Sequence, residues 1–198
     1  MSGATTPAHD YRVLHRHERF RGAVFSVVTD EVAMPGGGSA ERDYTRHVGA
    51  AAVVALDDEG RVVLVRQYRH PVGRYLWELP AGLLDVAGES PVHTAARELA
   101  EEADLTAQRW NLLVEIHTSP GYSDECVRVF LARDLAPVPD RDRHHREHEE
   151  ADMIVRRVGL DQAVAMTLCG EITNAIAMVG VLAAARARDD DWVPLRPA

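Results

Sequence analysis

The segment "AARELAEEADL", residues 95–105, places three glutamates and one arginine among alanines and leucines within roughly two to three turns of a helix. Ser90 and Pro91 predict that this helix begins near residue 91, because serine is a favoured N-cap and proline is tolerated in the first turn. At 100° per residue, the apolar side chains form one stripe, which predicts the face that packs on the core. The stripe consists of Val92, Ala96, Leu99 and Ala103, with Ala95 at its edge.

The three glutamates differ in where this helix places them. Glu98 and Glu102 are four residues apart and lie beside the stripe, whereas Glu101 lies on the more exposed side, where Arg97 can pair with it. Like charges at this spacing destabilise a helix by roughly 0.2–0.5 kcal/mol, and late carboxylates face the negative end of its dipole. A bound Mg²⁺ reverses both effects, because it takes carboxylate oxygens together with water and phosphate oxygens. The segment therefore indicates a metal site; the alternative is a solvated acidic face with one ion pair.

The overall composition indicates a globular protein with one domain, or with a core domain and a small appendage. The chain has 198 residues and a net charge of −9, which argues against nucleic-acid and anionic-membrane partners. No apolar run approaches the length of a membrane span, and residues 1–10 do not resemble a signal peptide, so we expect a cytoplasmic protein. An acidic protein that handles phosphates needs a local cation, which agrees with the proposed metal site.

The chain divides into two regions by its pattern. Residues 1–47 show short alternating runs and the turn "PGGGS" at 35–39, which predicts a small antiparallel sheet with limited apolar surface. Residues 48–198 are denser and predict an α/β fold, a mixed sheet sandwiched by helices. The strands predicted there are 51–56, 61–70, 76–79, 110–117, 126–135 and 152–159. The helices predicted there are about 91–103, 160–168 and 173–187, and residues 136–151 form a long polar loop.

The longer segment "PAGLLDVAGESPVHTAARELAEEADL", residues 80–105, resembles the Nudix box, G-x5-E-x7-R-E-U-x-E-E-x-G-U with U apolar. Eight of the nine fixed positions are filled, by Gly82, Glu89, Arg97, Glu98, Leu99, Glu101, Glu102 and Leu105. The first spacer holds six residues in place of five, which a loop can absorb. Asp104 replaces the final glycine at the helix end, where a left-handed conformation is usual. We expect this replacement to have a small stability cost and to leave the chemistry unchanged.

The resemblance implies a Nudix α/β/α sandwich around a mixed β-sheet that hydrolyses a nucleoside diphosphate linked to another moiety. It also implies a Mg²⁺ cofactor, with Mn²⁺ as the alternative. Glu98 and Glu102 would be the principal metal ligands, with Glu101 and the backbone carbonyl of Ala81 beside them. Two further residues, Glu89 and Arg97, would orient these carboxylates.

Three other segments resemble bacterial ADP-ribose pyrophosphatases of that family: "RQYRHPVGRYLWELPAGLLD" (66–85), "TSPGYSDE" (118–125) and "EEADM" (149–153). This resemblance implies hydrolysis of ADP-ribose to AMP and ribose 5-phosphate by a homodimer in which the 1–47 sheet crosses to the partner. Two alternatives stay open. One is the same chemistry on another nucleoside diphosphate sugar, and the other is a non-catalytic domain that senses ADP-ribose.

The resemblance also implies a catalytic glutamate in the late loop, which orients or deprotonates the attacking water. The candidates are Glu150, which aligns best, then Glu149, with Glu147 also open. Arg66 and Arg69 lie at a strand end just before the box, where Arg69 is a candidate phosphate or ribose clamp; Glu78 is a candidate ribose or adenine ligand. The expected lining of the terminal-ribose pocket is Gly121, Ser123, Asp124 and Glu125. The alternative for the three glutamates is a solvated acidic loop, for Arg69 a surface strand end, and for residues 121–125 a plain turn.

Overall fold

The computed structural model describes residues 10–146, 152–193 and 195–198. The chain forms two compact units, which are treated separately below. The first unit consists of the chain up to Val48 together with Ser119–Glu125, and the second consists of Gly49–Thr118 together with Cys126–Ala198. None of the helices in the described residues is both long and apolar enough to cross a membrane.

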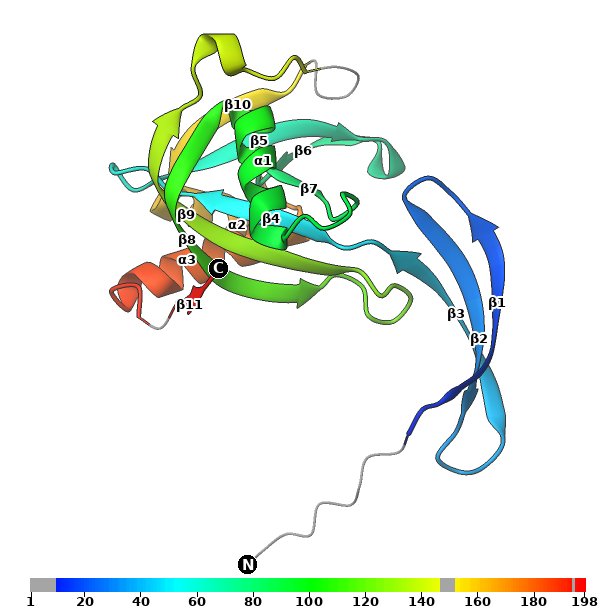
Figure 1. Cartoon of the computed structure of the whole chain (residues 1–198). Coiled ribbons are helices and arrows are strands. Elements are labelled where there is room, and N and C mark those ends of the chain that lie inside the picture. The colour runs from blue at the N-terminus through cyan, green and yellow to red at the C-terminus, as the bar shows by residue number, and fades with distance from the viewer. Residues whose placement is uncertain (1–9, 147–151, 194) are drawn as a thin grey trace, which may run out of the picture. The chain divides into compact units, whose positions relative to one another are not determined.

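The first unit is a three-stranded antiparallel sheet (Figure 1). Its strands, in spatial order, are β1 (Val13–Arg21), β2 (Phe25–Ala33) and β3 (Ser39–His47). The glycine-rich turn between β2 and β3 places Gly37 and Gly38 at positive φ, as a tight turn requires. Every residue of β1 is exposed and burial is concentrated in the middle of β2. The sheet therefore has little apolar core of its own, in agreement with the sequence pattern.

A buried acidic residue organises this sheet. Asp30 accepts hydrogen bonds from Arg16 Nε and Nη2, at 2.6 and 2.7 Å, and from the hydroxyl of Tyr44 at 3.0 Å. The two bonds from Arg16 lower the pKa of Asp30 below its ordinary value, against the effect of burial, which raises it. The three strands are thus joined by a charged network at a position where a larger domain would have apolar side chains.

We expect Asp30→Asn to lower the stability of the protein near neutral pH by roughly 1–3 kcal/mol, because hydrogen bonds to a charged group are lost. Since folding lowers the pKa of Asp30, the contribution of the pair is complete above the unfolded pKa, near 3.8, and disappears as pH falls through the lower folded pKa. Thermal unfolding across acidic pH should therefore show a steeper loss of stability in the unmodified protein than in the variant.

Glu18→Gln is the matched control for this experiment. Glu18 pairs with Arg21 within β1, and its side chain is exposed, so this ion pair contributes little to stability. We expect it to leave the pH profile nearly unchanged. Parallel acid profiles for Asp30→Asn and the unmodified protein would contradict the role of Asp30.

The second unit contains two sheets. Their strands are β4 (Ala50–Ala55), β5 (Arg61–Arg69), β6 (Arg74–Glu78), β7 (Ala81–Leu83), β8 (Leu105–His117), β9 (Cys126–Pro137), β10 (Ile154–Gly159) and β11 (Arg196–Pro197). One sheet has the order β11-β8-β9-β4-β7 and is mixed, because β4 is parallel to β9 and antiparallel to β7. The other is antiparallel with the order β10-β5-β6.

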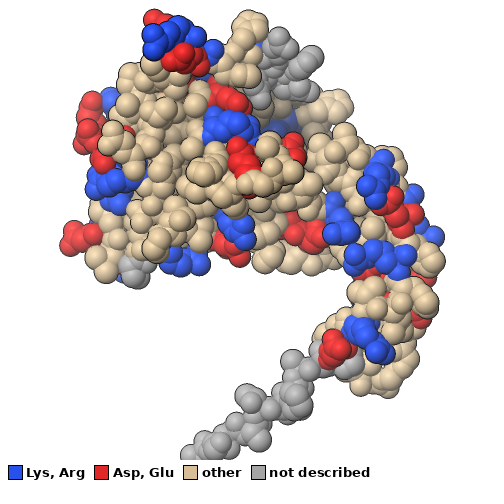
Figure 2. Space-filling model, in the orientation of Figure 1, with Lys and Arg blue, Asp and Glu red and all other residues tan. Residues whose placement is uncertain are grey.

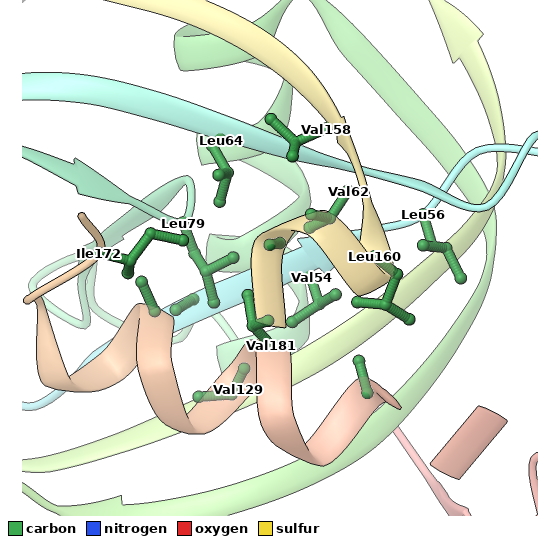
Figure 3. Packing of buried hydrophobic residues seen from close by; sticks show 14 of the residues in the cluster. Val54, Leu56, Val62, Leu64, Leu79, Val129, Val158, Leu160, Ile172 and Val181 are labelled. Atoms are coloured by element: carbon green, nitrogen blue, oxygen red, sulfur yellow. The ribbon is translucent and has the colours of Figure 1, made fainter. Parts of the chain in front are cut away.

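Helices cover both faces of this unit (Figure 1). They are α1 (Pro91–Ala103), α2 (Leu160–Leu168) and α3 (Ala175–Asp189). Successive residues of β4 point to opposite faces. Val53 belongs to the apolar cluster that contains residues of α1, whereas Val54 belongs to the cluster that contains residues of α2 and α3. Figure 3 shows the cluster that contains residues of α2 and α3, in which Val54 and Val129 lie beside Val181 of α3. The predicted α/β/α sandwich around a mixed sheet is therefore confirmed.

In the second unit, the ends of the predicted strands and helices lie within two residues of their predicted positions except at the start of β8, and β7 was not predicted as a separate strand. Helix α3 begins at Ala175, two residues later than predicted, because the side chain of Asn174 caps it by accepting a hydrogen bond from Ala177 N at 2.9 Å. Strand β8 begins at Leu105, five residues earlier than predicted, and β9 continues to Pro137. The added residues of β8 and β9 pair with each other, so each extension provides the hydrogen-bonding partner of the other. The local sequence of neither extension indicates this pairing.

Candidate active site

The three glutamates of helix α1 differ in their exposure to solvent. Its buried face runs through Ala95, Leu99 and Ala103, which fixes the rotation of the helix against the sheet. Ala95, predicted at the edge of the apolar stripe, is fully buried, whereas the predicted stripe residues Val92 and Ala96 are half-buried. Glu102 is 4% exposed, the Glu98 side chain is 12% exposed and the Glu101 side chain is 30% exposed. The predicted order is therefore observed: two sheltered carboxylates and one more exposed carboxylate.

The backbone of β7 contacts both sheltered carboxylates. Ala81 N donates a hydrogen bond to Glu102 Oε2 at 2.9 Å. Gly82 lies directly against Glu98, because a Cβ atom added at this glycine would overlap the Glu98 carboxylate. The glycine of the box therefore leaves the space that this side chain occupies. The strand supplies one surface on which two carboxylates from successive helical turns are held.

Arg97 is the counter-ion of this acidic cluster. Its Nη1 donates to Glu98 Oε1 at 2.6 Å and to Glu101 Oε2 at 3.1 Å. On its other side, Nε and Nη2 donate to the Glu89 carboxylate at 3.3 and 3.2 Å, and Thr94 Oγ1 donates to Glu89 Oε2 at 2.8 Å. Acidic and basic side chains accordingly lie side by side over α1 (Figure 2). The predicted Arg97–Glu101 pair is confirmed, whereas the contact with the adjacent Glu98 was not predicted.

These contacts favour the charged forms of both Glu89 and Arg97. The hydrogen bonds from Arg97 lower the pKa of Glu89, and its partner Glu89 raises the pKa of Arg97. Both side chains are therefore charged at neutral pH. Glu89 holds the guanidinium from one side while Glu98 and Glu101 share its other side.

The donor chemistry fits a hard divalent cation such as Mg²⁺ or Mn²⁺, because carboxylate and carbonyl oxygens are the protein ligands that these ions take. Within residues 10–146, 152–193 and 195–198, no three acidic, histidine or cysteine side chains are grouped at metal-binding spacing. Arg97 binds one oxygen of Glu98 and one oxygen of Glu101.

Two predicted substrate residues bind each other. Arg69, at the end of β5, donates from Nε to Glu78 Oε1 at 3.0 Å and from Nη2 to Glu78 Oε2 at 2.6 Å. Glu78 is buried and Arg69 is half-exposed, and the carboxylate raises the pKa of Arg69. The ion pair gives the buried Glu78 carboxylate a partner within the protein. The sequence had predicted Glu78 as a substrate ligand independent of Arg69. Arg66 lies over the ring of Tyr75, with its guanidinium carbon 4.9 Å from the ring centroid.

The predicted ribose-pocket loop belongs to the first unit, where it is bonded to β3. Thr45 N donates to the Tyr122 carbonyl at 2.8 Å, and His47 N donates to Asp124 Oδ1 at 2.7 Å. The Ser123 hydroxyl accepts from Glu125 N at 3.1 Å, and no Cβ clash would arise at Gly121. Two of the four candidates, Ser123 and Asp124, are thus already used in holding the loop. Pairing of this loop with β3 was not predicted, since its polar sequence has no periodicity.

The end of α1 has the predicted backbone conformation and an additional contact. Asp104 lies in the left-handed region, with φ 54° and ψ 38°. Its carboxylate also accepts a hydrogen bond from Arg146 Nη2 at 2.7 Å, so the expectation of a residue concerned with the helix end alone was incomplete. The three candidate bases, Glu147, Glu149 and Glu150, lie outside the described residues.

Known proteins resemble this chain in both sequence and fold. Residues 45–175 match the NUDIX domain family. The ADP-ribose pyrophosphatase of Mycobacterium tuberculosis is 51% identical over 175 residues, covering 88% of this chain and 83% of the relative. The ADP-ribose pyrophosphatase of Bacillus subtilis is 36% identical over 165 residues, covering 83% and 86%.

A crystal structure described as an ADP compounds hydrolase superposes with a TM-score of 0.77, covering 94% of this chain and 98% of that one. At 20% identity it shows the fold. The family match spans more than half of the chain, and it includes the segment from Ala81 to Asp104 on which the carboxylates are assembled. This chain belongs to the Nudix family.

Proposed function

We propose that this protein hydrolyses the pyrophosphate bond of ADP-ribose to give AMP and ribose 5-phosphate. The observation that carries the proposal is the presence of Glu98, Glu101 and Glu102 on one helix, with Glu98 and Glu102 held against β7, in a chain 51% identical to an ADP-ribose pyrophosphatase. A Nudix domain that had lost catalysis would have no reason to keep three crowded carboxylates on one helix.

Nudix proteins typically depend on a divalent metal, and we assign Mg²⁺ to the carboxylates of α1, with Mn²⁺ as the alternative. Glu98 and Glu102 are the principal ligands, and Glu101 and the Ala81 carbonyl complete the protein's contribution. When bound, the cation spreads the charge of the pyrophosphate and can activate water. Arg97 neutralises the carboxylates when no cation does so, and Glu89 keeps this arginine beside them.

The remaining residues bind substrate and move a proton. Glu150 orients or deprotonates the attacking water, with Glu149 and then Glu147 as the alternatives. Arg69 is positioned by Glu78 and contacts the phosphates or ribose with the exposed part of its guanidinium. The other proposed substrate contacts are Arg66, Gly121, Ser123, Asp124 and Glu125.

The proposed assembly is a cytoplasmic homodimer in which the sheet of residues 1–47 packs on the partner subunit. The exposure of β1 supports it, because that strand carries Val13, Leu14 and Phe20 on the surface of its unit. The net charge of −9 supports the absence of nucleic-acid and membrane partners.

A substrate panel with Mg²⁺ tests the proposal. It compares ADP-ribose with ADP-glucose, GDP-mannose, dinucleotides and nucleoside triphosphates. We expect the highest kcat/KM for ADP-ribose, with AMP and ribose 5-phosphate as products and no turnover after chelation of the metal. A higher kcat/KM for another nucleoside diphosphate sugar would identify that compound as the substrate, with the same pyrophosphate hydrolysis. Binding of ADP-ribose without hydrolysis of any compound would identify a sensing domain and reject the enzyme.

A further inference from the structure

Asp104 makes contacts that a glycine at this position of the Nudix box could not make. Its Oδ2 accepts from Arg146 Nη2 at 2.7 Å, and Arg143 Nε lies 4.0 Å from its Oδ1. Both arginines come from the segment that follows β9, some forty residues later in the chain. A side chain in the αL position at the end of α1 therefore joins this helix to a distant segment.

Arg146 also binds the backbone of the metal helix. Its Nε donates to the Glu101 carbonyl at 3.0 Å. The last four carbonyls of a helix lack intrahelical donors, and a positive charge there interacts favourably with the helix dipole. One guanidinium thus contacts the carbonyl of a proposed metal ligand and the carboxylate three residues later. Two simultaneous contacts fix its orientation, and both side chains of the ion pair are about three-quarters buried.

We propose that Asp104 and Arg146 are positioning residues for the reaction. Their ion pair ties the chain at Arg146 to the C-terminal end of the helix that carries Glu98, Glu101 and Glu102. Together with the bond from Arg146 to the Glu101 carbonyl, the pair holds the last turn of this helix, and with it the backbone of Glu101 and Glu102, in place. This inference rests on the proposed function, because it concerns the geometry of its metal ligands.

Two substitutions of Asp104 separate positioning from helix capping. Asp104→Asn removes the charge and keeps a residue that tolerates the αL conformation, whereas Asp104→Gly removes the charge and relieves that conformation. We expect both variants, and Arg146→Gln, to lower kcat by about 10-fold with little change in KM, since small misplacements of reacting groups are costly. The melting temperature of Asp104→Gly should be at or above that of Asp104→Asn. Activity and stability would then change in different directions, which a purely structural role does not predict.

A double-mutant cycle supplies the second test. If the two residues act through one contact, kcat of Asp104→Asn/Arg146→Gln should be no lower than that of either single variant. Arg141→Gln is the control, because this arginine lies in the same segment with 86% of its side chain exposed. Hydrogen exchange of the backbone around Arg143 and Arg146 should be faster in Asp104→Asn than in the unmodified protein, whichever substrate is used.

The outcomes distinguish this inference from the proposed function. Failure of the unmodified protein to hydrolyse ADP-ribose would reject the proposed substrate, and the cycle is then measured on the best substrate of the panel and by hydrogen exchange. Values of kcat within two-fold of the unmodified protein in Asp104→Asn and Arg146→Gln, or unchanged exchange, would overturn the positioning role.

Discussion

Glu98→Gln and Glu102→Gln are each expected to lower metal-dependent release of AMP from ADP-ribose by at least about 100-fold, since even residues that only support a metal ligand cost 10–100-fold when replaced. Glutamine keeps the shape of the side chain and loses the charge that a divalent cation requires. At position 102, the amide oxygen can still accept the hydrogen bond from Ala81 N, so this variant is expected to fold. Steady-state kinetics at saturating Mg²⁺, with thermal unfolding of the same samples, measures both effects.

Two comparisons sharpen that experiment. Glu101→Gln should cost less than either, because Glu101 is the most exposed of the three carboxylates. Glu115→Gln is the matched control, since Glu115 is a β8 carboxylate paired with Arg128 and is not part of the cluster around α1. Turnover close to that of the unmodified protein in both Glu98→Gln and Glu102→Gln would reject these residues as the metal ligands.

Features of the site that depend on neighbours along the chain were predictable from the sequence. The 91–103 helix has the predicted bounds, because its proline start and apolar stripe are local signals. The same periodicity correctly ordered the exposure of its glutamates. The αL conformation of Asp104 was predictable as well, since a helix end commonly requires it.

Features that depend on distant side chains were not predictable. The sequence marks Arg69 as a candidate phosphate or ribose contact, but it does not indicate that Arg69 is also bound by the buried carboxylate of Glu78 on the neighbouring strand β6. Likewise, nothing in the polar run around Arg146 indicates that this arginine, among several, reaches Asp104. Charged residues in a loop lack periodicity, so their partners are decided by the tertiary fold. The sequence identifies such residues as candidates and leaves their pairing open.

Gly82 shows how a motif position acquires a physical reason only from the fold. The sequence marks it as the first glycine of the box, and a loop or turn would be the ordinary explanation. In the structure it lies in β7, against the Glu98 carboxylate, where any side chain would displace a proposed metal ligand. The six-residue spacer between this glycine and Glu89 lies beyond that contact and leaves it intact.

Glu150→Gln is expected to lower kcat for ADP-ribose by about 10²–10⁴-fold, the usual contribution of a general base, with a much smaller change in the affinity for substrate. The carboxylates of α1 are engaged by Arg97, by Ala81 N and, in the proposed enzyme, by the cation, so the water needs a further carboxylate to take its proton. Single-turnover rates and ADP-ribose binding to the same variant separate the two quantities.

Glu149→Gln and Glu147→Gln are the matched comparisons, because they remove the same charge from the same short run of sequence. A base must reach its proton within hydrogen-bond distance, so one glutamate should account for most of the loss and its neighbours for little. If Glu149→Gln has the large effect, the assignment of the base moves by one residue and the mechanism stands. If all three variants keep turnover within a few-fold of the unmodified protein, this segment does not supply the base.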